Sequence, residues 1–207
     1  MTYQEITDYL LNTQNDLLRG TIIEMAYQYY SESSTPTSKM EDCVSHIDFS
    51  SDTETVDVKA PKKDFKANDK FNGKWTLVEL RNVAGNTGWL KGKADYIVFC
   101  VPLYDKSWWF IKVPRKELLD YVIKEYGEPP SVVDTEVKGC EPELWHYYRR
   151  EGRDDAFIYL DIIEVMMNVR CIRIPAEEYL TKAIEVDKEL NKQIKEAHKS
   201  MRENKNL

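Results

Sequence analysis

Residues 94–113 read ADYIVFCVPLYDKSWWFIKV, and this stretch decides the kind of fold that the chain can adopt. It contains two apolar runs, 94–101 and 107–113, each of a length typical of a buried β-strand. The segment between them is short and begins at Pro102, so the two runs are predicted to pair as a β-hairpin. The core of the fold is therefore expected to contain a sheet.

Further strands are predicted before this hairpin. Polar and apolar residues alternate through 43–49 and 53–59, and a short Ser/Asp turn separates them, which indicates a second hairpin. A lysine-rich connection, 60–74, leads to a predicted strand at 75–81, which is expected to form a further hairpin with 53–59 across this long loop. Later in the chain, extended segments are predicted at 156–165 and 169–174.

Helices are predicted at both ends of the chain. Residues 3–32 lack proline and carry apolar side chains at three- and four-residue spacing, which indicates an amphipathic helix broken or bent at Gly20. A helix at 115–126 is predicted to end at Gly127, and a long helix is predicted to begin at Pro175. The predicted class is α+β: a helix, a mostly antiparallel meander, then helices.

The composition is typical of a folded, water-soluble chain. Hydrophobic residues make up 42% and charged residues 31% of 207 residues, enough for one compact domain with a core. There is no apolar run of about 18 residues and no secretory signal at the N-terminus, so a cytoplasmic location is expected. Four cysteines without CxxC spacing disfavour a zinc knuckle. Serine hydrolases, NTPases and dinucleotide-binding enzymes are disfavoured because their motifs are missing.

Basic residues gather in one part of an acidic chain. The formal net charge is −7, yet residues 59–93 carry nine lysines and arginines against three acidic residues. Such a stretch is expected if one face meets phosphate, although a solvated lysine-rich loop gives the same count. Trp89 either stacks on a base or anchors its loop in the core. The residues predicted to contact nucleic acid are Lys62, Lys63, Lys66, Trp89, Lys91 and Lys93.

Two pairs of charged residues are predicted on strand faces. Asp57 and Lys59 project from one face of strand 53–59 because they are two residues apart, and Glu79 and Arg81 do the same in strand 75–81. If these strands pair antiparallel, the four side chains converge. Two carboxylates on adjacent strands can hold Mg²⁺ or Mn²⁺, which activates water for phosphodiester hydrolysis. Cross-strand ion pairs on a solvent-facing sheet are the alternative interpretation.

A family resemblance favours the first interpretation. The segments VDVKAPKK (56–63), WTLVELRNV (75–83) and GNTGWLKGKADYIVF (85–99) resemble, in this order, the PD-(D/E)xK nuclease superfamily and its small phage-type members. The resemblance spans about residues 1–125. It implies a restriction-endonuclease-like core, assigned to residues 1–128. Residues 129–207 lie outside the resemblance and are expected to form a C-terminal extension that ends in a long amphipathic helix and packs on the core. It also implies a phage-encoded, Mg²⁺-dependent endonuclease acting on duplex or branched DNA in the host cytoplasm, in many members as a homodimer.

The resemblance also implies roles for single residues. Asp57 matches the metal-binding aspartate and Glu79 the acidic residue of (D/E)xK. Arg81 stands where the motif has its lysine, so Lys59, on the same predicted face, is expected to supply the amine, with Lys93 as another source. For the acidic residue that the superfamily often adds from its first helix, Glu24 and Glu5 both remain open.

A second motif assignment uses other residues. It pairs Asp48 with Asp57-Val58-Lys59 as the (D/E)xK element, and this version has its lysine. It ranks second because it leaves Glu79 and the segment after it unexplained. A different function also stays open, in which the chain is an inactive nuclease-like protein that binds DNA or a host protein. The acidic remainder of the chain suits a protein partner.

Overall fold

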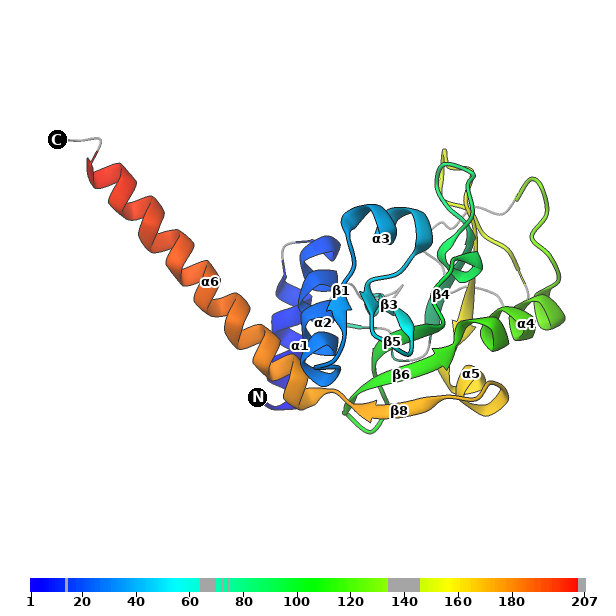
Figure 1. Cartoon of the computed structure of the whole chain (residues 1–207), viewed down its shortest axis with the longest axis horizontal. Coiled ribbons are helices and arrows are strands. Elements are labelled where there is room, and N and C mark those ends of the chain that lie inside the picture. The colour runs from blue at the N-terminus through cyan, green and yellow to red at the C-terminus, as the bar shows by residue number, and fades with distance from the viewer. Residues whose placement is uncertain (14, 64–69, 72, 74, 134–145, 205–207) are drawn as a thin grey trace.

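The chain has an α+β fold, seen in the computed structural model of Figure 1. The structure describes residues 1–13, 15–63, 70, 71, 73, 75–133 and 146–204, so the predicted nucleic-acid contact Lys66 lies outside it. Within these ranges the chain forms a mixed six-stranded sheet, a two-stranded sheet and six α-helices. None of these helices is long and apolar enough to span a membrane.

The six-stranded sheet has the order β1-β2-β3-β5-β6-β8. The predicted hairpin in 94–113 is confirmed, because β5 and β6 pair antiparallel with Cys100 opposite Phe110. The predicted mostly antiparallel meander is wrong at one central position, where β3 runs parallel to β5. The strands are β1 (Thr35–Pro36), β2 (Phe49–Ser50), β3 (Thr55–Lys59), β5 (Tyr96–Pro102), β6 (Trp108–Pro114) and β8 (Ile172–Pro175).

The strand predicted at 75–81 exists, but the antiparallel pairing with 53–59 does not. This strand, β4 (Trp75–Arg81), pairs instead with β7 (Ala156–Asp161) in a separate two-stranded sheet. The reason is that β7, with the sequence AFIYLD, supplies apolar side chains for both faces of the pair. One face joins the main core, and the other forms a small aromatic cluster of Trp75, Tyr148, Phe157 and Tyr159.

The N-terminal region departs from the prediction in two places. The predicted helix 3–32 is two helices, α1 (Tyr3–Asn12) and α2 (Asp16–Tyr30), and Gly20 lies inside α2 rather than at the break. Asn15 starts α2, because its Oδ1 accepts a hydrogen bond from the Leu18 amide at 2.8 Å.

The second difference concerns the first half of the predicted hairpin. The first three residues of the strand predicted at 43–49 belong to helix α3 (Lys39–Ser45), and only the short strand β2 pairs with β3. A capping box explains the helix, because Ser38 and Glu41 bond reciprocally to each other's backbone N–H groups.

The remaining helices place a core on each face of the sheet. Helices α1, α2 and α6 (Glu177–Asn204) pack on one face. The other face packs against η1 (Trp89–Lys91), α4 (Arg115–Tyr126), α5 (Ile162–Asn168) and the β4–β7 pair. Among the described residues after 128, β7, β8 and α6 pack on the rest of the chain, and Figure 1 shows the second half of α6 extending away from the body.

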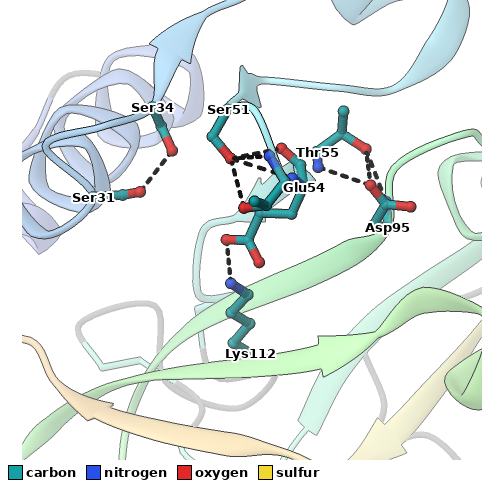
Figure 2. Close-up of polar contacts among 8 residues, drawn as sticks. Ser31, Ser34, Ser51, Glu54, Thr55, Asp95 and Lys112 are labelled. Carbon is teal, nitrogen blue, oxygen red and sulfur yellow. Dashed lines mark hydrogen bonds and ion pairs between the residues drawn. The ribbon is translucent and has the colours of Figure 1, made fainter.

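Polar contacts fix the start of β3 against β5 and β6 (Figure 2). The backbone N–H and the hydroxyl of Thr55 both donate to Asp95 Oδ2 at 2.8 Å. Next to it, Glu54 forms an ion pair with Lys112 of β6, whose side chain is buried. These contacts hold β3 in register, and β3 carries the charged residues described next.

Candidate active site

Asp57 is a buried carboxylate in the middle of β3. Only 1% of its surface is exposed, although it is charged at neutral pH in an ordinary setting. Its Oδ1 lies 2.5 Å from Lys59 Nζ, while its Oδ2 has no hydrogen-bond partner among the described residues. Burial raises the pKa of Asp57, and the charge of Lys59 opposes that shift. A proton or a cation at this buried oxygen would therefore stabilise the Asp57 carboxylate.

Asp48 stands beside Asp57 because β2 pairs with β3. It precedes β2 by one residue, and its backbone N–H donates to Val56 O at 2.8 Å. The Val58 N–H donates to Asp48 Oδ2 at 2.6 Å, which holds the carboxylate in place. Burial and the neighbouring Asp57 raise the pKa of Asp48 to about 7. The two carboxyl groups adjoin, so a proton on one would hydrogen-bond to the other.

Glu24 of α2 adds a third carboxylate near this pair. Burial, Asp48 and Asp42 raise the pKa of Glu24 to about 7. Glu24, Asp42 and Asp48 line one pocket of about 460 Å³. The other helix candidate, Glu5, is engaged elsewhere, because it forms the capping box of α1 with Thr2. Of the two acidic residues left open by the sequence, the structure brings Glu24 to the site.

Lys59 supplies the positive charge of the site. Its side chain is 27% exposed, and its Nζ lies over the ring of Trp89 at 5.1 Å from the centroid. Burial lowers the pKa of Lys59, but the carboxylates of Asp57 and Asp48 outweigh it, so the net shift is upward. Lys59 therefore stays protonated. Trp89 is buried and packs on Phe99, which places it in the core, as the second interpretation of this residue expected.

The residues present fit a magnesium ion held by few protein ligands. No group of three or more His, Cys, Asp or Glu side chains in the described ranges is close enough to form a protein-only metal cage. Mg²⁺, however, usually takes one or two carboxylates and completes its shell with waters and substrate phosphate. Asp48 and Asp57 supply two carboxylates, and the unpartnered Oδ2 of Asp57 suits a cation.

Glu79 and Arg81 lie on β4 rather than on a strand next to β3. Glu79 pairs with Arg150 at 3.1 Å, and Arg150 also pairs with the buried Asp155 at 3.0 Å. Burial raises the pKa of Glu79 above its usual value, although the charges of Arg150 and Lys59 oppose this shift. Lys59 is therefore close enough to Glu79 for their charges to interact. Arg150 and Asp155 were not among the predicted site residues, because the sequence around them mixes aromatic, basic and acidic side chains without a motif.

Arg81 has a role in holding a loop. Its Nε donates to Asp154 O at 2.8 Å and its Nη1 to Pro130 O at 3.1 Å. These carbonyl groups belong to the segment that follows α4. Two nitrogens of the guanidinium are thus held by backbone acceptors, while Nη2 lies 3.9 Å from Asp154 Oδ1 and has no hydrogen-bond partner among the described residues. The structure does not bring this group to Asp57.

The other predicted nucleic-acid contacts are spread over the surface. Lys62 is exposed close to Lys59, and Lys63 forms an isolated β-bridge with Phe71. Lys91 pairs with Glu128 at 2.7 Å, while Lys93 is exposed. A buried arginine of α2, Arg19, was not predicted, because a single basic residue in a helix gives no signal in the sequence.

Comparison with known proteins adds no assignment. No family model matches the chain, and no curated protein or solved structure resembles it closely enough to count as a match.

Proposed function

We propose that the chain is a metal-dependent nuclease of the PD-(D/E)xK type that hydrolyses phosphodiester bonds of DNA. The observation that carries the proposal is the buried Asp57, with one unpartnered carboxylate oxygen, between Asp48 and Lys59. This arrangement favours the second motif assignment, in which Asp48 is followed by Asp57-Val58-Lys59. The packing of N-terminal helices on a sheet that contains the β2–β3 hairpin supports a restriction-endonuclease-like core.

Each side chain then has a chemical task. Asp48 and Asp57 would hold Mg²⁺, which when bound supplies a Lewis acid and a water of lowered pKa. Lys59, protonated and fixed by Asp57, presents its charge where the scissile phosphate becomes more negative. Glu24, with its pKa raised to about 7, can accept and release a proton near neutral pH.

The first test is DNA cleavage with variants that separate the two motif assignments. Purified protein is incubated with supercoiled plasmid, single-stranded DNA and a four-way junction in Mn²⁺ or Mg²⁺. Asp57→Asn is expected to lower the cleavage rate by about 100-fold or more, because it removes a charged metal ligand. Asp48→Asn should do the same, whereas Glu79→Gln should retain activity within about tenfold. If Glu79→Gln abolished DNA cleavage and Asp48→Asn cleaved at the wild-type rate, the first motif assignment, with Asp57 and Glu79, would be favoured instead.

A second candidate function is an inactive nuclease-like protein that binds DNA or a host protein. The observation that favours it is the projecting part of α6, where Val186, Leu190 and Ile194 are exposed at four-residue spacing. This stripe also suits a homodimer. Folded protein that cuts none of the three DNAs and binds no Mn²⁺ would favour this function over the nuclease.

A further inference from the structure

A second pocket adjoins Lys59 and has the opposite charge. It has a volume of about 130 Å³, and it shares no lining residue with the acidic pocket of Glu24 and Asp48. Three cationic side chains line it against one carboxylate. The lining residues are Asp16, Arg19, Lys59, Ala60, Pro61, Lys62, Thr76, Leu77 and Trp89.

Arg19 is the unusual member of this lining. The residue is only 3% exposed, and its Nε has no hydrogen-bond partner among the described residues. One nitrogen, Nη2, pairs with Asp16, and the guanidinium carbon lies 5.5 Å from the centre of the Phe71 ring. A buried guanidinium with an unused donor is costly unless an acceptor arrives.

Lys62 completes the pocket from the loop after β3. Its side chain is exposed, and no hydrogen bond or ion pair from its ammonium to a described residue is found. Although the residue as a whole is exposed, partial loss of water around its ammonium lowers the pKa of Lys62, as do the charges of Arg150, Arg19 and Lys59, while Asp16 raises it. Cations that repel one another at short range attract an anion strongly.

The size of the pocket limits its ligand. About 130 Å³ exceeds the roughly 30 Å³ that one water occupies in the liquid. It is well below the roughly 300–1,000 Å³ of pockets that enclose drug-sized ligands. A pocket of this size suits a small group such as a single tetrahedral anion. Guanidinium and ammonium groups together are the usual protein partners of such an anion.

We propose that Arg19, Lys59 and Lys62 form a binding subsite for one phosphate group of a nucleic acid, next to the phosphate that is cleaved. The inference rests on the proposed function only for the identity of the cleaved phosphate. Lys59 joins the two sites, because it lines this pocket while its Nζ contacts the Asp57 carboxylate. The bound group is either an internal phosphodiester or a terminal phosphate, which carries more charge.

The test measures DNA binding in EDTA, where no cleavage can occur. Fluorescent single-stranded oligonucleotides with a 5′-phosphate or a 5′-hydroxyl are titrated with wild-type protein, Lys62→Ala and Arg19→Lys. The control is Lys116→Ala, which removes an exposed lysine of α4 outside the pocket. Lys62→Ala is expected to weaken binding about fivefold at about 0.1 M salt and to reduce the salt slope by about one. Lys116→Ala should change the affinity less than twofold.

The two oligonucleotides distinguish the source of the phosphate. If the pocket holds a terminal phosphate, wild-type protein prefers the phosphorylated oligonucleotide and Lys62→Ala removes the preference. If it holds an internal phosphate, Lys62→Ala weakens the binding of both by the same factor. Wild-type affinity and salt slope in Lys62→Ala and in folded Arg19→Lys would overturn the proposal. Binding that depends on Lys62 in a protein that cuts no DNA would keep the subsite and reject the nuclease.

Discussion

Asp48→Asn is expected to make the metal-free protein more stable while it destroys the proposed metal site. The Asp48 carboxyl has a pKa of about 7 in the fold against 3.8 in an ordinary setting. A group whose pKa rises on folding contributes its stability below the unfolded value and loses it as pH rises through the folded value. Wild-type protein in EDTA should therefore lose stability between about pH 4 and pH 7.

Asparagine avoids this loss because it does not ionise. Its side-chain oxygen can still accept from the Val58 N–H, and its amide can donate to the unpartnered Oδ2 of Asp57. Urea unfolding in EDTA at pH 8 should show a gain on the order of 2–4 kcal/mol, with a smaller gain at pH 5. The control Asp52→Asn, an exposed carboxylate in the turn before β3, should stay within about 0.5 kcal/mol. A less stable Asp48→Asn protein at pH 8 would contradict this account of the cluster.

Lys59→Met is expected to have the opposite effect on stability. It leaves the Asp57 carboxylate, 1% exposed, without its cation. Breaking a buried pair in this way typically costs about 3–5 kcal/mol, and we expect a loss on the order of 3 kcal/mol in urea unfolding at pH 8. The loss should shrink at pH 5, because Asp57 in the variant can take up a proton instead.

The same substitution tests the role of Lys59 in cleavage while it leaves both proposed metal ligands in place. Cleavage by Lys59→Met should fall by about 100-fold, because the charge facing the phosphate is gone, although both carboxylates remain. Lys59→Arg is the matched control: it keeps the positive charge beside Asp57 and should recover most of the stability. A Lys59→Met protein that is equally stable at pH 8 and cleaves at the wild-type rate would show that the pair has neither role.

The sequence predicted the parts of the fold that depend on neighbouring residues. The β5–β6 hairpin and α4 follow from local apolar runs, a short turn and a glycine, Gly127, at the helix end. The capping box of α3 was also present in the sequence, at Ser38 and Glu41, but the alternating pattern after it was given more weight. The break before Asn15 was missed because Gly20 is the more obvious helix breaker, although a cap residue is the better signal.

Strand partners could not be predicted in the same way. Strands β3 and β5 are separated by a long connection, and β4 and β7 are further apart still. An apolar strand fits several partners, so alternation alone does not choose among them. The same ambiguity led to the wrong prediction for Glu79. It was expected beside Asp57 through a strand pairing that does not form. Asp48 reaches Asp57 through the short β2–β3 pairing. Asp57 and Lys59 were candidates from the sequence, and Glu24 was one of two helix residues that the sequence left open.

The most direct test of the central claim is a calorimetric titration of Mn²⁺ into wild-type protein, Asp48→Asn and Glu79→Gln at pH 8, in the absence of DNA. The account predicts that wild-type protein and Glu79→Gln bind the ion and that Asp48→Asn binds it at least about tenfold more weakly, since Asp48 and Asp57 are the proposed ligands. No binding by folded wild-type protein, or binding by Asp48→Asn as tight as that of wild-type protein, would contradict it.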